Sequence, residues 1–138
     1  ENIRMCLSKV TKIHTPPLPR ERTAWKVFDT EPDGLHFFDR GFQAPRGVWL
    51  KATRRELGNY VSGFHAFKTK KDAVTYAQFD GGYVPKGGIL KVKIRGVRTE
   101  GKQIVNYVYI PEHGYESNAY AHTYVADELY IPAPGEKI

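Results

Sequence analysis

The clearest regular pattern along the chain is the alternation of apolar and basic residues between positions 89 and 97. Side chains on a β-strand point alternately to opposite faces, so this pattern predicts a strand with one apolar face and one basic face. The apolar set is Leu90, Val92 and Ile94, and the basic set is Lys91, Lys93 and Arg95.

Shorter apolar runs earlier in the chain predict a hairpin and a third strand. Trp25–Phe28 and Leu35–Phe38 read as two strands joined by the turn Glu31–Gly34, whose Pro, Asp and Gly residues favour tight turns. Val48–Ala52 predicts a further short strand.

The strongest helix signal follows a strand that is apolar on both faces. Phe64–Phe67 has apolar side chains in both orientations, which indicates a central strand. Thr69 is a suitable N-cap, with Asp72 three residues later, and apolar residues then recur at helical spacing. The pattern predicts a helix over 69–79.

The second half of the chain predicts more strands. Thr99–Lys102 reads as a turn, after which Ile104–Ile110 returns as a β-branched and Tyr-rich strand to form a long hairpin. Thr123–Ile131 predicts the final strand. The expected fold class is α+β, a strongly bent antiparallel sheet of six or seven short strands with one main helix.

A proline-rich segment suggests the domain boundary. Thr15–Pro19 contains three prolines, which cannot donate to a sheet ladder, so it is expected to be extended and to separate an N-terminal arm from the body. We therefore expect an arm over 1–24 and a single domain over 25–138. A chain of 138 residues can bury a hydrophobic core in one such domain.

The composition limits the cellular compartments in which we expect the protein. The single cysteine, Cys6, excludes an intrachain disulfide and favours a reducing cytoplasm. No apolar run is long enough to span a bilayer, so no membrane association is expected.

Charge is unevenly distributed along the chain. Residues 61–110 carry nine Lys or Arg against three acids, whereas residues 111–138 carry one against five. This asymmetry has two interpretations: the basic middle binds an anionic partner, or the acidic tail packs beside it and neutralises it.

The basic face is the main candidate binding site. Alternate cations lie about 6.6 Å apart along a strand, a spacing comparable to that of successive phosphates. Tyrosines on the predicted returning strand could offer stacking surfaces for bases. The alternative is an edge hairpin whose lysines prevent aggregation. The candidate binding residues are Lys91, Lys93, Arg95, Arg98, Lys102, Tyr107 and Tyr109.

Other chemistries have little support. The five histidines show no metal-ligand spacing, and no glycine pattern matches a phosphate loop or a dinucleotide turn. We therefore expect no metal and no cofactor. The apolar faces of the last strands leave a dimer possible.

Two family resemblances suggest functions. The order from Trp25–Phe28 through Phe64–Phe67 to Val125–Pro132 resembles a family of small phage and prophage proteins. That resemblance implies an accessory protein acting in the bacterial host cytoplasm, for instance against host machinery or a defence system, but it implies no specific activity.

A weaker similarity is to the ADP-ribosyltransferase core. It implies that residues 64–77 form the nicotinamide-side strand and helix, and that Glu128 is the acid that stabilises the ribosyl cation. The segment His36–Phe38 departs from the motif with which those enzymes grip the dinucleotide.

The two hypotheses differ in class. The favoured one is a non-enzymatic binding module whose basic hairpin engages nucleic acid or an acidic host protein. The alternative is a nucleotide- or NAD-using transferase, for which Tyr60, His65 and Glu128 are the catalytic candidates.

Overall fold

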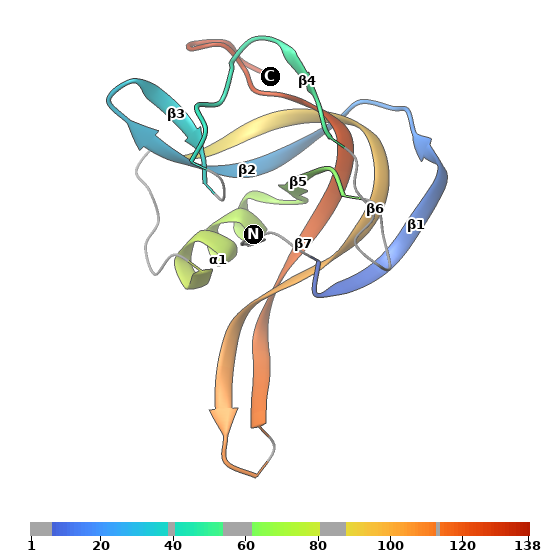
Figure 1. The fold of residues 1–138 in the computed structure, drawn as a ribbon, viewed down its shortest axis with the longest axis vertical. Helices are drawn as coiled ribbons and strands as arrows, with labels where there is room; N and C mark the ends of the chain where they lie inside the picture. The colour runs from blue at the N-terminus through green and yellow to red at the C-terminus, as the bar shows by residue number, and fades with distance from the viewer. Residues whose placement is uncertain (1–6, 39–40, 54–61, 81–87, 113) are drawn as a thin grey trace.

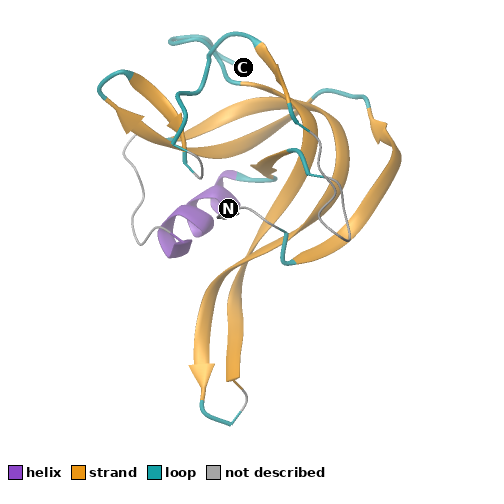
Figure 2. Cartoon of the chain, viewed as in Figure 1, coloured by secondary structure: helices purple, strands orange, loops and turns teal. Residues whose placement is uncertain are grey.

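The computed structural model describes residues 7–38, 41–53, 62–80, 88–112 and 114–138, with side chains of 78–80, 105–110 and 114–118 left aside. Most of this chain forms one antiparallel sheet with a single helix (Figures 1 and 2). The elements are β1 (Lys9–Leu18), β2 (Arg22–Glu31), β3 (Gly34–Phe37), β4 (Trp49–Lys51), β5 (Phe64–Phe67), α1 (Lys70–Asp80), β6 (Ile89–Ile110) and β7 (Gly114–Tyr130).

Four of the strands form a closed circuit. β6 pairs with β2 on one edge and with β7 on the other, while β5 lies between β2 and β7. The link between β2 and β5 is the single pair Trp25 and Phe67. The sheet is therefore strongly bent, as Figure 1 shows for β6 and β7. The predicted central position of β5 is confirmed.

β6 changes the side of its buried residues where Gly96 lies against Asp127 of β7. Gly96 has φ of +71°, which a side chain would disfavour, and a Cβ there would lie 2.9 Å from the Asp127 Cβ. Before Gly96 the buried residues of β6 are Val92 and Ile94, and after it they include Val97. The buried residues are therefore even-numbered before this glycine and odd-numbered after it, and this change lets one long strand bend around the core.

The two larger buried clusters lie on opposite faces of the sheet. The smaller one lies under α1, where Tyr76 packs against Phe67 with ring centroids 5.0 Å apart. The larger cluster lies on the other side of the sheet, where side chains of β2, β5, β6 and β7 meet. Its buried members are Ala24, Phe28, Leu35, Ala44, Ala66, Val92, Ile94, Val97, Tyr124, Ala126, Leu129 and Ile131.

The helix prediction is confirmed, and its N-cap has the expected geometry. The Asp72 amide donates to Thr69 Oγ1 at 3.1 Å, and the Thr69 hydroxyl donates to Asp72 Oδ2 at 2.7 Å. The other Asp72 carboxylate oxygen accepts from the His122 amide at 3.1 Å. The cap thus also attaches the start of α1 to β7.

The turn predicted at Thr99–Lys102 is wrong. β6 runs without interruption through these residues, so the two strands expected on either side of the turn are one strand of 22 residues. Gly101 serves another purpose: a Cβ there would collide with the Lys9 carbonyl of the neighbouring β1, so this glycine permits close strand approach. The long hairpin is instead formed by β6 and β7, which pair as far as Ile110 and Gly114.

The segment expected to be a separate arm belongs in part to the sheet. β1 pairs with β6 from Lys9 opposite Lys102 to Leu18 opposite Val97, and β2 begins at Arg22. The Pro-rich segment is tolerated because β1 is an edge strand, where missing amide donors leave no ladder partner unsatisfied. No helix in the described part of the chain has the length and apolar character needed to cross a membrane.

Candidate functional site

The basic residues of β6 share a sheet face with aromatic residues from three other strands. Lys91 lies opposite Trp25 of β2, and Lys93 lies opposite Tyr130 of β7, which in turn pairs with Trp49 of β4. Residues opposite one another in an antiparallel pair project to the same side. The register therefore interleaves cations and rings on the face that also carries α1.

Ring contacts link these residues in two groups, and Lys91, opposite Trp25 in the register, lies between the groups along β6. Lys70 Nζ lies 5.6 Å from the centre of the Trp25 ring, and Lys93 Nζ lies 5.4 Å from that of Tyr130. Tyr130 and Trp49 have ring centroids 5.5 Å apart. We call the whole set the cation–aromatic strip; it consists of Lys70, Trp25, Lys91, Lys93, Tyr130, Trp49 and Arg95.

Arg95 is held in place at one end of the strip. Its guanidinium carbon lies 3.9 Å from the centre of the Trp49 ring, while Nε and Nη2 donate to the two Glu128 carboxylate oxygens at 2.8 and 3.1 Å. These hydrogen bonds lower the pKa of Glu128 and raise that of Arg95. The bidentate pair therefore fixes the guanidinium plane against the indole.

Arg98 is also paired with an acid of the tail. Its Nε donates to Asp127 Oδ1 at 2.6 Å, and both side chains are largely buried. Arg95 and Arg98 thus follow the second interpretation of the charge asymmetry, since acids of residues 111–138 neutralise both. Because each guanidinium already pairs with a carboxylate, neither arginine is a free cation waiting for a phosphate.

Lys93 is less tightly held. Its nearest carboxylate oxygen among the ion pairs of the described residues is Glu21 Oε2 at 3.9 Å, and its side chain is 29% exposed. Tyr130 beneath it donates its hydroxyl to Glu136 at 2.8 Å. That hydrogen bond raises the pKa of Tyr130, and the Ala133 amide together with the Tyr130 hydroxyl lowers that of Glu136.

Lys91 and Lys70 form no ion pair with any residue that the structure describes. Together with Lys93 they provide the strip with three ammonium groups that are unpaired or weakly paired. These lysines are therefore the groups best placed to attract an external anion.

The remaining predicted binding residues lie farther along β6. Lys102 is on the same strand, with Nζ 5.3 Å from the centre of the Tyr120 ring. Tyr107 and Tyr109 belong to β6 itself rather than to a returning strand, and Tyr107 is roughly 40 Å of strand contour beyond Arg95. These three residues are therefore separate from the strip.

The catalytic candidates are not brought to one pocket by the described residues. Tyr60 lies outside the described residues. His65 is buried in β5 opposite Val125, about 10 Å of strand from Glu128. The Glu128 carboxylate is already bound by Arg95, so it is not a free acid beside a cleft.

Comparisons with protein families, curated proteins and solved structures found no match.

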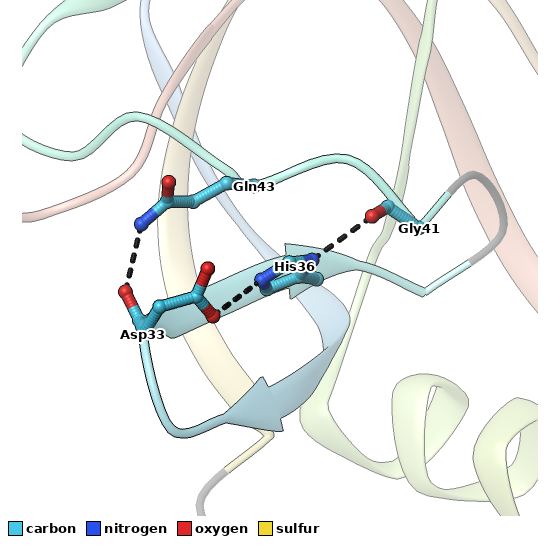
Figure 3. A network of polar contacts seen from close by, with 4 residues as sticks. All are labelled: Asp33, His36, Gly41 and Gln43. Atoms are coloured by element: carbon cyan, nitrogen blue, oxygen red, sulfur yellow. Dashed lines mark hydrogen bonds and ion pairs between the residues drawn. The ribbon is translucent and has the colours of Figure 1, made fainter.

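Sequence reasoning missed a polar network beside the β2–β3 hairpin (Figure 3). His36 contacts Asp33 Oδ1 through Nε2 at 2.8 Å and the Gly41 carbonyl through Nδ1 at 2.9 Å, while Gln43 Nε2 donates to the Asp33 carbonyl at 2.7 Å. The network borders an open depression of about 410 Å³, to which Asp29 and Glu31 also contribute. The local signal was an Asp within a tight turn and a His just after it.

The network requires a particular protonation state of His36. A carbonyl and a carboxylate oxygen only accept hydrogen bonds, so both ring nitrogens must donate, which is possible only in the imidazolium form. The Gly41 carbonyl and Asp33 accordingly raise the pKa of His36, and His36 lowers that of Asp33. The described residues contain no cluster of His, Cys, Asp and Glu suited to a metal ion.

Proposed function

We propose that the protein is a binding module for single-stranded nucleic acid and that the cation–aromatic strip is its contact surface. The observation that carries this proposal is the interleaving of lysines with Trp25, Tyr130 and Trp49 on one sheet face. Binders of single strands combine a basic track for the phosphates with rings on which bases stack.

The composition of the strip favours a single strand over a duplex. Phosphates alone require only cations, whereas rings are useful when bases are unstacked and accessible. Trp49 and Tyr130 are both partly exposed, and they form a tilted pair beside Lys93. A base could stack on the exposed part of these rings while its phosphate contacts Lys93 or Lys91.

Glu128 receives a positioning role in this proposal rather than a catalytic one. It holds the Arg95 guanidinium over the Trp49 ring, where the guanidinium extends the surface that the aromatic residues offer. A transferase would instead need Glu128 free to face a ribosyl cation.

The test is fluorescence anisotropy with labelled single-stranded DNA and RNA and a duplex of the same sequence. The double variant Lys91→Ala/Lys93→Ala is compared with Lys9→Ala/Lys12→Ala, which removes the same charge from the edge strand β1. We expect the first to weaken single-strand binding about tenfold or more and the second by less than about threefold.

Trp49→Leu separates stacking from charge. It should weaken single-strand binding about fivefold or more, since a stacked base contributes about 1–3 kcal/mol, and it should affect duplex binding less. Equal losses in the two lysine variants, or binding indifferent to Trp49→Leu, would contradict the proposed surface.

A further inference from the structure

The second half of β6 leaves the body of the protein together with the first half of β7. The two strands pair from Ile104 opposite Tyr120 to Ile110 opposite Gly114, and Figure 1 shows them projecting well beyond the sheet. We call residues 104–110 and 114–120 the ribbon. Within the described residues, the two strands of the ribbon pair only with each other.

The outer edge of β6 in the ribbon begins where its neighbour β1 stops. β1 ends its pairing at Lys9 opposite Lys102, the Ser8 amide donates to the Lys102 carbonyl, and Ser8 Oγ accepts from the Ile104 amide at 2.9 Å. No described residue pairs with this edge beyond Ile104. A two-stranded ribbon with no further strand and no covering helix is marginally stable on its own.

The two edges on this side of the molecule are built very differently. β1 carries Lys9, Lys12 and two prolines, which are the usual devices that prevent an edge strand from pairing with another chain. The ribbon segment Ile104–Ile110 has no charged residue and no proline, and it is rich in β-branched residues and tyrosine. One edge is protected against pairing, and the other has the composition of a strand that pairs.

The charge of the ribbon indicates the class of its partner. Residues 103–120 contain two glutamates and no Lys or Arg, whereas the whole chain carries a net charge of +6. An acidic segment repels phosphates, so nucleic acid is the wrong partner for this part of the molecule.

We propose that the ribbon is a dimerisation element, in which the β6 edge of one chain pairs antiparallel with the β6 edge of a second copy. A twofold axis places the same edge of two copies antiparallel, and the hydrogen-bond pattern of an antiparallel pair is self-complementary. Because Ile104–Ile110 is uncharged, no like charges meet across the axis. The β7 edge carries Glu116, which makes it the poorer candidate.

The dimer converts two marginal ribbons into one four-stranded sheet. The proposed pairing is centred near Tyr107, the midpoint of the uncharged run. It also holds two strips in one assembly, which raises the avidity for a long single strand.

The test is sedimentation velocity of the full chain over a wide concentration range, with Tyr107→Lys and Tyr115→Lys compared with wild type. Both variants add the same charge to the ribbon, but only Tyr107→Lys adds it to the β6 strand, where two ammonium groups would meet across the axis. We expect a concentration-dependent dimer in wild type. Tyr115→Lys should weaken the dimer affinity less than about threefold, whereas Tyr107→Lys should weaken it about tenfold or more.

Thermal unfolding of both variants distinguishes loss of pairing from loss of folding, since a folded Tyr107→Lys monomer is the expected result. Hydrogen exchange supplies a second readout: the amides of residues 105–109 should become protected as concentration rises. A wild type that is monomeric at every concentration, or a dimer that Tyr107→Lys leaves intact, would overturn the proposal. Neither result depends on nucleic-acid binding.

Discussion

The two halves of β6 show how differently one strand can be used. Along residues 89–102, β6 pairs with β2 and then β1 on one edge and, from Lys93 onward, with β7 on the other, and its buried face includes Val92 and Ile94. Residues 104–110 have a partner strand on one edge only among the residues that the structure describes. The first half carries all five basic residues of β6, and the second half carries none.

This difference follows from which neighbours each half has. Where both edges are paired and one face is buried, the other face is free to carry charge, because the core already fixes the register. Where an edge has no neighbour, charged residues or prolines are needed to prevent association, and the β6 strand of the ribbon has neither. The first half is therefore suited to display a binding surface, and the second half to pair.

The largest contrast in the free energy of unfolding should appear between a side chain removed from the buried half of β6 and one removed at the base of the ribbon. Ile94→Ala removes a fully buried side chain from the larger cluster and should lower the free energy of unfolding by about 2–5 kcal/mol. Tyr120→Ala removes a side chain of β7 that lies opposite Ile104 at the ribbon base and is 45% exposed, and it should cost less than about 1 kcal/mol. Urea denaturation measures both; similar losses would refute the division into a buried and an exposed half.

The turn of β6 at Gly96, within the first half, should be the next most sensitive point. Gly96→Ala combines a positive φ with a collision against Asp127, and we expect a loss of about 1–3 kcal/mol. Gly135→Ala is the matched control, because Gly135 has φ of +82° and nothing within 4 Å of its would-be Cβ. Denaturation midpoints should rank Gly96→Ala below Gly135→Ala, and the reverse order would show that the Asp127 contact is unimportant.

Breaking the Arg95–Glu128 pair should affect binding more than stability. Glu128→Gln should cost less than about 1 kcal/mol, since Arg95 is 39% exposed and solvent screens the pair. Its lowered pKa means that Glu128 stabilises the fold above its unfolded-state pKa and loses that contribution as the pH falls through the folded-state value. The stability gap between wild type and variant should therefore close in acid, as thermal melts over a pH series would show.

The same variant also tests the positioning role. With Arg95 released from Glu128, its stacking on Trp49 should weaken, and single-strand binding should change while duplex binding does not. No change in either binding constant would argue that the pair is purely structural.

The smallest effect is expected at the His36 network. Because its pKa is raised, His36 stabilises the fold fully below its unfolded-state pKa, and that contribution is lost as the pH rises through the folded-state value. Asp33 behaves in the opposite sense, losing its contribution as the pH falls through a lowered pKa. NMR titration of His36 should show Asp33→Asn lowering its pKa, and an unchanged titration would contradict the assigned contact.

Local sequence patterns predicted the elements that depend on nearby residues. The Thr69 and Asp72 cap and the alternation in residues 89–95 were sufficient, since a capping box and a period of two are properties of short segments. The turn at residues 99–102 was mispredicted because Gly101 looks like a turn residue but instead allows β1 to approach. That role depends on a strand about ninety residues away in sequence.

The candidate site was only partly predictable for the same reason. The basic face of β6 could be recognised from its alternation, but its aromatic neighbours Trp25, Trp49 and Tyr130 come from three other strands. The ion pairs of Arg95 and Arg98 likewise depend on the β6–β7 register. Sequence spacing contains no information on that register once the intervening turn is misplaced.

The central claim is that the lysines of the strip contact phosphates, and the salt dependence of single-strand binding tests it most directly. The slope of the logarithm of affinity against the logarithm of salt concentration reports the number of phosphates neutralised, about 0.7 per contact on a single strand. We predict a clear slope in wild type that falls by about 1.4 in Lys91→Ala/Lys93→Ala and is unchanged in Lys9→Ala/Lys12→Ala. A slope that is the same in all three proteins would contradict the claim.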